Sequence, residues 1–380
     1  MKKNLIYFDN AATSNFKPKC VIKTFLKALK NSANPGRSGH KLSMQNALEV
    51  WKTREVVSTH FGDINAENII FTKNCTEALN IALLGTLKKG KNVVTTCFEH
   101  NSVLRPLTEL ANKELITLTI VEPQNKKYIT SLDIEKNLSK NTYLVCVGSI
   151  SNVTGNQNDI FEIGKLCNKK GILFLVDNAQ GSGHIKLDMK INHINYLTFA
   201  GHKGFLSPQG IGGLCINTKH IPSPIMYGGT GSESSNLFQP STLPESLESG
   251  TLPTQAILSL KKGVEYIVKN FTKHETKISK LTFYLYNQLK SIDGIKIYSL
   301  PNYKSGIISF NYKKYDSIEI SEYLNTQYNI ATRGGLHCAP LTHKFFNTLQ
   351  EGMVRISLSF KNTKKEINTL IKALKQYKID

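Results

Sequence analysis

The stretch Gly171-Ile172-Leu173-Phe174-Leu175-Val176-Asp177 decides the fold. Its apolar residues follow one another without alternating with polar ones, which is typical of a strand that is covered on both faces. The run is too short to cross a membrane. Ligands of open α/β sheets lie beyond the carboxyl ends of such strands. We therefore expect Asp177 at a ligand site, with the alternative that its carboxylate only caps the next helix or loop.

Other β-rich runs alternate with helical patterns along the chain, at residues 69–72, 93–96, 143–147 and 196–199. This alternation predicts an α/β fold, with βα units around a mainly parallel central sheet flanked by helices. Two apolar stripes at helical spacing are predicted to belong to the core. They are Val21, Ile22, Phe25, Leu26 and Leu29 near the beginning, and Ile367, Leu370, Ile371 and Leu374 near the end.

A change in composition indicates two domains. Residues 227–253 are polar and rich in Gly, Ser and Pro, and a long helical pattern follows them. We place the boundary near Ala256. The prediction is a large domain of residues 15–255 and a smaller α+β C-terminal domain of residues 256–380, joined by residues 1–14.

The charge of the chain restricts its partners. There are 48 Lys and Arg against 28 Asp and Glu, a net charge of +20, but the lysines are spread along the chain and form no long basic block. Because strand-binding grooves combine basic with aromatic residues, we expect no specific nucleic-acid partner. A generally basic surface is predicted to favour anions or an acidic protein.

Seven cysteines without a Cys-x-x-Cys pair argue against a zinc site and against a disulfide framework. We therefore expect no metal and a reducing cytoplasm. The basic start Met1-Lys2-Lys3 precedes an apolar stretch that breaks at Asp9 and Asn10, so we expect no secretory signal. No apolar run approaches the roughly 18 residues of a membrane span, and we expect a soluble protein without a membrane partner.

Lys203, in Thr198-Phe199-Ala200-Gly201-His202-Lys203-Gly204, is the candidate for covalent chemistry. A lysine behind an apolar strand can be desolvated, which lowers its pKa and suits it to Schiff-base chemistry with an aldehyde cofactor. Most lysines in so basic a chain are surface residues, so the assignment depends on Asp177. The Asp177 carboxylate can hold the protonated pyridine nitrogen of such a cofactor, so that the pyridine ring accepts electrons from a carbanion.

Several motifs resemble, in the same order, those of the cysteine desulfurases, which are class V, fold-type I enzymes of pyridoxal 5'-phosphate. They are Tyr7-Phe8-Asp9-Asn10-Ala11-Ala12-Thr13, Thr76-Glu77-Ala78, Glu99-His100-Asn101, Ser151-Asn152-Val153-Thr154-Gly155, Val176-Asp177-Asn178-Ala179-Gln180, Gly201-His202-Lys203 and Arg333-Gly334-Gly335-Leu336-His337-Cys338. The resemblance runs from about residue 5 to about residue 360. The stretches at residues 34–40 and 335–341 are most similar to the desulfurase and selenocysteine lyase branch. The resemblance implies the fold-type I transferase fold and a homodimer.

The resemblance also implies which residues bind the cofactor. They are Lys203 for the covalent bond, Asp177 for the ring nitrogen, His100 for stacking and proton transfer, Asn152 and Gln180 for the phenolic oxygen, and Cys75, Thr76 and His202 for the phosphate. Gly250 and Thr251 would reach the phosphate of the neighbouring subunit. Ala200 departs from the family, which usually has Ser or Thr there, so one phosphate donor is missing. By themselves, Thr76 could be a plain N-cap and His100 a structural hydrogen-bonding residue.

Substrate recognition is assigned to arginines, because a planar guanidinium binds a carboxylate through two parallel hydrogen bonds. Arg355 resembles the family's carboxylate-binding arginine, and Arg333 would orient the substrate or the loop. Arg37 and His40 would line the entrance. The alternative for these side chains is a surface ion pair.

Cys338 separates sulfur transfer from ordinary transamination or elimination, because only sulfur transfer needs a nucleophilic thiol. Glycines and Pro340 place it in a loop, and His337 is predicted to favour its thiolate. Cys146 and Cys215 lie in apolar runs and are predicted to be buried fillers. Leu336 stands where the family usually has a second histidine.

The predicted activity is that of a cysteine desulfurase. Sulfur from L-cysteine passes to Cys338 as a persulfide, L-alanine leaves, and a thiol-bearing acceptor protein or small thiol takes the sulfur; selenocysteine could enter the same chemistry. The alternative enzyme is a selenocysteine lyase or another lyase or aminotransferase that uses pyridoxal phosphate. A third hypothesis is a non-catalytic basic binding protein with a disabled fold of this type, suggested by the net charge, Ala200 and Leu336.

Overall fold

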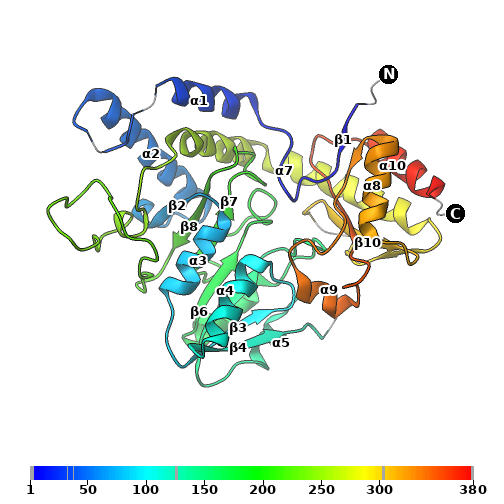
Figure 1. The fold of residues 1–380 in the computed structure, drawn as a ribbon, viewed down its shortest axis with the longest axis horizontal. Helices are drawn as coiled ribbons and strands as arrows, with labels where there is room; N and C mark the ends of the chain where they lie inside the picture. Colours follow the sequence, from blue (N-terminus) through cyan, green and yellow to red (C-terminus); the bar gives the residue numbers. More distant parts are fainter. Residues whose placement is uncertain (1–3, 32, 37, 125–126, 302–303, 378–380) are drawn as a thin grey trace.

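The computed structural model describes residues 4–31, 33–36, 38–124, 127–301 and 304–377, which form a large layered α/β unit and a smaller one beside it (Figure 1). The helices are α1 (Lys19–Lys30), α2 (Lys41–His60), α3 (Cys75–Gly85), α4 (Asn101–Asn112), α5 (Ser131–Glu135), α6 (Ile160–Lys170), α7 (Thr254–Lys290), α8 (Ser317–Tyr328), α9 (Pro340–Phe346) and α10 (Lys364–Gln376). The strands are β1 (Ile6–Tyr7), β2 (Ile69–Thr72), β3 (Lys91–Thr96), β4 (Ile116–Val121), β5 (Thr142–Gly148), β6 (Leu173–Asp177), β7 (Tyr196–Ala200), β8 (Gly212–Ile216), β9 (Ile295–Ile297), β10 (Ile307–Tyr312), β11 (Ile330–Ala331) and β12 (Val354–Ser357).

The large sheet has seven strands in the order β2-β8-β7-β6-β5-β3-β4. All neighbours pair in parallel except at β8, which is antiparallel to both β2 and β7. The carboxyl ends of β2, β3, β5, β6 and β7 therefore lie at the same edge of the sheet. The five predicted strands, including the decisive run that forms β6, are confirmed, as is the mainly parallel sheet.

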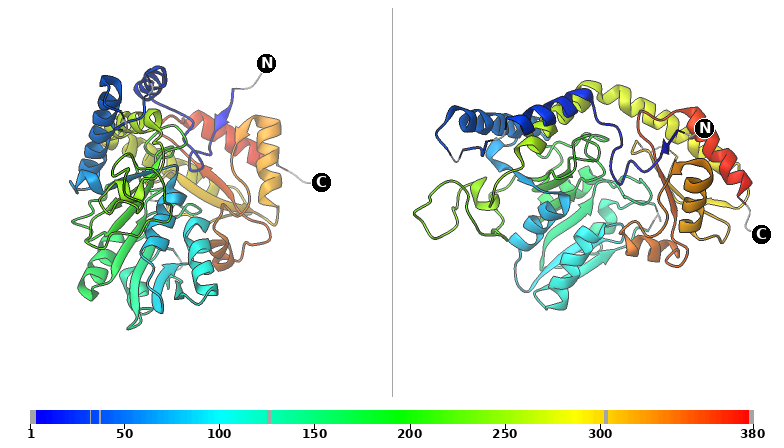
Figure 2. Two further views of the ribbon diagram at one scale, coloured as in Figure 1. Left: turned by 60° about the vertical axis from the view of Figure 1, so that its left-hand side comes forward. Right: turned by 45° about the horizontal axis from the view of Figure 1, so that its top comes forward.

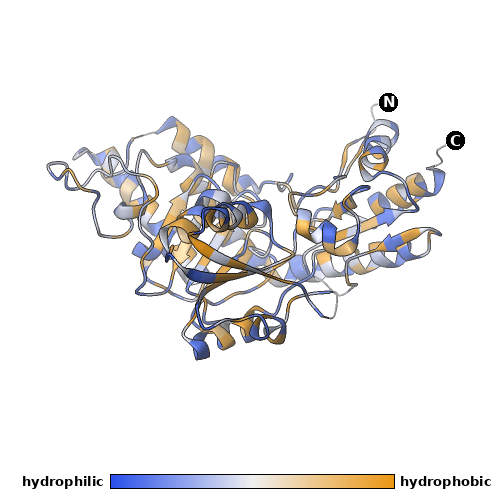
Figure 3. Cartoon of the chain, turned by 60° about the horizontal axis from the view of Figure 1, so that its bottom comes forward, coloured by the Kyte–Doolittle hydropathy of each residue, from blue (hydrophilic) through white to orange (hydrophobic). Residues whose placement is uncertain are grey.

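Burial explains why the central strands are continuously apolar. Every residue of β7 and β8 is buried, and so are Phe174 to Asp177 of β6. Helices cover both faces of the sheet, and Figure 3 shows hydrophobic residues concentrated in its strands. A sheet with both faces covered excludes water from its interior, so polar side chains gather at its edges. The carboxyl edge is where the predicted site residues lie.

The smaller unit is built around a three-stranded antiparallel sheet in the order β12-β10-β9. The 37-residue helix α7 packs against α1 and α2 on one side and against α10 and β9 on the other, so it connects the two units (Figure 2). The N-terminal strand β1 pairs with β11, far from α1 (Figure 1). The predicted boundary near Ala256 falls in the first turn of α7, and the division into two domains stays a prediction.

The two apolar helical stripes have different outcomes. In α10, Ile367, Leu370, Ile371 and Leu374 are all buried, which confirms the prediction for this helix. The prediction for α1 is wrong: Val21 is buried, but Ile22, Leu26 and Leu29 are 47%, 50% and 52% exposed. Helical spacing identifies an apolar face but not what covers it. The outer face of α1 is therefore an apolar surface.

None of the helices within the described residues combines the length and the apolar character that a membrane crossing requires.

Candidate active site

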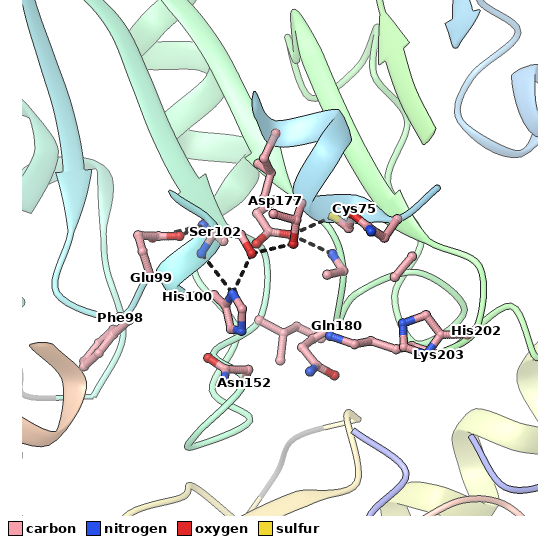
Figure 4. Close-up of a pocket in the computed structure, with 17 residues that line it drawn as sticks. Cys75, Phe98, Glu99, His100, Ser102, Asn152, Asp177, Gln180, His202 and Lys203 are labelled. Carbon is pink, nitrogen blue, oxygen red and sulfur yellow. Dashed lines mark hydrogen bonds between the residues drawn. The ribbon is translucent and has the colours of Figure 1, made fainter. Parts of the chain in front are cut away.

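One pocket opens at the carboxyl edge of the large sheet. The predicted site residues that line it are Lys203, Asp177, His100, Asn152, Gln180, Cys75, Thr76 and His202 (Figure 4). They come from segments up to about 130 residues apart in the chain, and the shared direction of the strands brings them together.

Lys203 and Asp177 enter this pocket from adjacent strands. Lys203 lies in the turn after β7, and Asp177 is the last residue of β6. Burial of the amine lowers the pKa of Lys203, and the negative charge of Asp177 opposes this shift. Asp177 Oδ1 accepts a hydrogen bond from the Ala179 amide at 2.9 Å, which fixes the carboxylate. An amine with a lowered pKa beside an oriented carboxylate is suited to imine chemistry.

The N-terminus of α3 forms one end of the pocket. Asn74 caps this helix by accepting a hydrogen bond from the Glu77 amide at 2.9 Å, so the alternative that Thr76 is the N-cap is wrong. Amides in a helix's first turn lack intrahelical acceptors and carry partial positive charge, which makes this end an anion site. The hydroxyls of Thr76 and Ser102, 2.8 Å apart, are further donors at the same place.

The Cys75 thiol points away from that anion site. Its sulfur lies 3.3 Å from Thr198 Oγ1 and 3.6 Å from Asp177 Oδ1. Burial and the charge of Asp177 raise the pKa of Cys75, so the thiol stays protonated and donates to one of these oxygens. Cys75 would therefore meet an anion at α3 through its backbone amide.

His100 is the N-cap of α4 and also lines the pocket. Its Nδ1 accepts a hydrogen bond from the Ser102 amide at 3.0 Å. Burial lowers the pKa of His100 to about 4, so the ring is neutral at pH 7. Because Nδ1 is an acceptor, the proton of the neutral ring is assigned to Nε2. The capping role and a role beside the cofactor are compatible in this geometry.

The N-terminal segment braces the floor of the pocket. The His202 carbonyl accepts hydrogen bonds from the Ser14 amide at 3.1 Å and the Ser14 hydroxyl at 2.9 Å, and His202 Nδ1 lies 3.0 Å from Thr13 Oγ1. Gln180 donates to the Ala11 carbonyl at 3.0 Å. These bonds hold the turn that carries Lys203, and the segment of Gln180, against residues 11–14.

Cys338 lies in a strained loop at the mouth of the site. His337 and Cys338 have φ angles of 52° and 57°, in the left-handed region that non-glycine residues rarely adopt. The Cys338 carbonyl accepts a hydrogen bond from the Asn101 amide at 2.7 Å, and Asn152 donates to the His337 carbonyl at 2.7 Å. The loop of the smaller unit is thus tied to two segments of the pocket, while the Cys338 side chain is exposed.

A cation does lie beside the Cys338 sulfur, but it is not His337. Arg333 Nη2 is 3.8 Å from the sulfur. His337 is 2% exposed, its Nε2 is 3.1 Å from the Arg333 carbonyl, and burial lowers its pKa well below the usual value. The ring therefore supports the loop as a neutral group, contrary to the predicted action on the thiol. Arg333 supplies the positive charge that interacts favourably with an anionic sulfur.

Arg355 is buried, at 1% exposure, and contacts Asn152 of the pocket lining. Its Nη2 forms an ion pair with Asp9 at 2.8 Å, and its Nη1 donates to the Asn152 carbonyl at 2.9 Å. Its Nε has no hydrogen-bond partner among the described residues. The guanidinium thus connects the N-terminal segment, the Asn152 segment and β12, and a substrate carboxylate would have to share it with Asp9.

The remaining predicted residues lie elsewhere. Gly250 lines a different cleft, together with Pro35, Gly36 and Trp51, and Thr251 beside it is exposed. His40 is exposed and caps α2 by accepting from the Ser43 amide at 3.3 Å. Arg37 lies outside the described residues.

The sequence did not identify two ionisable residues of the site. Glu99 lines the pocket at 1% exposure, and Asp9 holds Arg355. Both belong to motifs that were recognised, so a signal was present at each position. Their partners, however, are 49 and 346 residues away in the chain, at Gly148 and Arg355.

An amine, an oriented carboxylate and a helix N-terminus at the carboxyl edge of a mainly parallel sheet define a fold-type I enzyme. The family model for class V aminotransferases matches residues 6–370, and the chain belongs to this family, whose members use pyridoxal phosphate. Curated relatives named probable cysteine desulfurase include one from Borreliella burgdorferi, 35% identical over 98% of this chain and 92% of the relative. Another, from Pyrococcus abyssi, is 34% identical over 99% and 95%. The apo cysteine desulfurase of Thermococcus onnurineus superposes with a TM-score of 0.91, at 32% identity and coverage of 98% and 94%.

Proposed function

We propose that this protein is a pyridoxal-phosphate-dependent cysteine desulfurase. The observation that carries the proposal is the exposed thiol of Cys338, held beside Arg333 on a strained loop that is tied to the pocket of Lys203 and Asp177. Transamination would leave such a thiol without a use. The names of the curated relatives support the same activity.

The residues of the pocket fit pyridoxal phosphate. Lys203 would bind its aldehyde, Asp177 its ring nitrogen, and the N-terminus of α3 with Thr76 its phosphate, with His202 at the same end. His100 would lie on the ring, and Asn152 and Gln180 line the pocket near it. When bound, the cofactor supplies a ring that accepts the electron pair left by removal of the substrate's α-proton.

The protein's own groups then move the proton and the sulfur. Lys203 Nζ takes the α-proton of L-cysteine, which its lowered pKa favours. Cys338 Sγ attacks the sulfur of the substrate, so a sulfur–sulfur bond forms as the carbon–sulfur bond breaks. The electron pair of the broken bond stays on the carbon fragment, which is protonated and leaves as L-alanine. A thiol of an acceptor protein or a small thiol then removes the terminal sulfur of the persulfide.

Arg355 and Arg333 are the candidates for holding the substrate carboxylate. Arg355 has an Nε without a hydrogen-bond partner among the described residues and a bond to Asn152, but Asp9 already occupies its Nη2. Arg333 is partly exposed beside Cys338. A carboxylate between these two guanidiniums would place the substrate sulfur toward the thiol. The assignment of Arg37 and His40 to the entrance stays a prediction.

We also propose that two copies form the working unit. Ile22 and Leu26 of α1 and Met44 and Leu48 of α2 are each about half exposed, which is costly for a free surface. Gly250 and Thr251 lie outside the pocket of their own chain, as expected of residues that complete the partner's phosphate site.

Light scattering should give twice the mass of the chain, and a stable monomer that is fully active would contradict the dimer.

A buried ion pair fixes the segment that carries Gly250. Arg54 of α2 and Glu248 form a two-bond ion pair at 2.8 and 2.6 Å, with both side chains 4% exposed. The Glu248 carboxylate also accepts from the Phe71 amide at 2.5 Å. Removing one member of a buried pair costs about 3–5 kcal/mol, because the other charge is left unpaired. The segment is therefore fixed in each chain before any partner binds.

The function is tested by incubating the purified protein with L-cysteine and measuring both products. L-Alanine and sulfide, released in equal amounts in the presence of a reducing thiol, are expected. Formation of a keto acid without alanine would contradict the proposal and indicate a lyase or aminotransferase. Comparing L-cysteine with selenocysteine in the same assay gives the preference between sulfur and selenium.

The cellular setting is proposed to be the cytoplasm. All seven cysteines are free in the structure, and persulfide chemistry at an exposed cysteine requires a reducing environment.

A further inference from the structure

Glu99 is a buried carboxyl group in the pocket that the proposed chemistry does not use. It lies in the turn between β3 and α4, immediately before His100, and is 1% exposed. One oxygen accepts from the Thr96 hydroxyl at 2.6 Å. The Gly148 amide, at the end of β5, donates to both oxygens at 3.1 and 2.9 Å. The side chain therefore connects the His100 turn to a neighbouring strand (Figure 4).

The hydrogen-bond partners of Glu99 among the described residues are uncharged. Its donors are an alcohol and an amide, and no ion pair among the described residues includes it. Gly148 pairs directly with Asp177 on β6, so the second carboxyl of the pocket is one strand away. The titratable groups around it are Cys97 and His100 on its own turn, Cys146 on β5, Asp177 on β6, and Lys203 and Cys75 across the pocket.

These surroundings favour the neutral acid. Burial raises the pKa of Glu99 to about 8; the hydrogen bonds from Thr96 and Gly148 oppose this shift, and the charge of Asp177 adds to it. Asp177, by contrast, has the Ala179 amide and the nearby amine of Lys203. Glu99 and Asp177 therefore have different electrostatic surroundings in one pocket, and such differences are how active sites separate acid from base.

We propose that Glu99 is a positioning residue that acts as a neutral acid: its proton lies between Glu99 Oε1 and the Thr96 hydroxyl, and its carboxyl group holds the His100 turn against the end of β5. This role rests on the proposed function only for its effect on turnover. Ionisation of Glu99 would place a second buried negative charge beside the site for the cofactor's phosphate and ring. Cofactor binding and His100 geometry would both be weakened.

The pH dependence has a definite sign. A carboxyl whose pKa is higher in the folded protein than in the unfolded chain favours folding at low pH. That contribution is complete below the unfolded pKa and is lost as the pH rises through about 8. Activity that requires the protonated form is expected to fall over the same alkaline range.

The direct test uses infrared spectroscopy on the cofactor-free protein. The wild type should show the carbonyl band of a protonated carboxylic acid at neutral pH, and this band should disappear as the pH rises through about 8. It should be missing in Glu99→Gln and unchanged in Glu122→Gln, a matched control at an exposed position. Absence of the band in the wild type, or its persistence in Glu99→Gln, would overturn the proposal. This measurement does not depend on desulfurase activity.

A second measurement separates positioning from simple structural support. Glu99→Gln keeps the size and an oxygen acceptor, so kcat at pH 7 should stay within about threefold of the wild type while the alkaline loss of activity moves to higher pH. Glu99→Ala should lower kcat about tenfold or more, with little change in KM. An unchanged pH profile in Glu99→Gln would overturn the proposal. Absence of any alanine formation by the wild type would instead contradict the proposed function.

Discussion

Replacing Lys203 by alanine is expected to abolish both the visible absorbance of the bound cofactor and the formation of alanine from L-cysteine. Lys203 is the one lysine that lines the pocket among the described residues, and its amine is desolvated. Loss of the group that binds the aldehyde and moves the α-proton should reduce kcat by more than about a thousandfold. Absorbance spectra of protein purified with pyridoxal phosphate, combined with alanine quantification, measure both effects.

The matched control is Lys169→Ala, at an exposed position of α6. It removes the same charge from the same chain and should leave the spectrum and turnover unchanged. Retention of the absorbance band by Lys203→Ala would show that another amine carries the cofactor. A wild-type protein that binds no pyridoxal phosphate would instead favour a non-catalytic binding protein.

The strands and the sheet could be predicted from the sequence because their residues are buried on both faces. In β6 and β7 a continuous run of apolar residues indicates burial on both faces, whichever elements pack against the strand. The stripe of α1 looks the same as that of α10, yet only the α10 stripe is buried within the chain. The sequence pattern shows that one face of a helix is apolar. Whether that face is buried depends on which helix, strand or second chain packs against it.

The pocket could be predicted in part, for the same physical reason. Residues that follow parallel strands, such as Asp177 and Lys203, share an edge once the strand order is parallel. Contacts made by the C-terminal loop were not predictable, because they depend on how the smaller unit meets the larger one. The cation beside Cys338 is Arg333 and not the adjacent His337, since the left-handed backbone at residues 337–338 accompanies a buried imidazole. Glu99 was missed because its partner Gly148 is 49 residues away in the chain.

Cys338→Ser is expected to stop sulfur transfer while leaving the cofactor in place. Serine has nearly the same size, but its hydroxyl stays protonated at neutral pH and cannot accept sulfur as a persulfide. Alanine formation from L-cysteine should fall at least about a hundredfold. Because Cys338 does not line the cofactor pocket, the absorbance of bound pyridoxal phosphate should be unchanged. The persulfide itself can be detected by mass spectrometry after alkylation, as one added sulfur on the peptide that contains Cys338.

Cys20 provides the control, because it is the other exposed cysteine and lies on α1, away from the pocket. Cys20→Ser should keep full activity and the persulfide on Cys338. Arg333→Met should give an intermediate loss, since the thiol stays but the charge 3.8 Å from its sulfur is removed. If Cys338→Ser forms alanine at the wild-type rate, sulfur must leave by elimination or through another thiol. The role of Arg333 would then be limited to binding the substrate carboxylate.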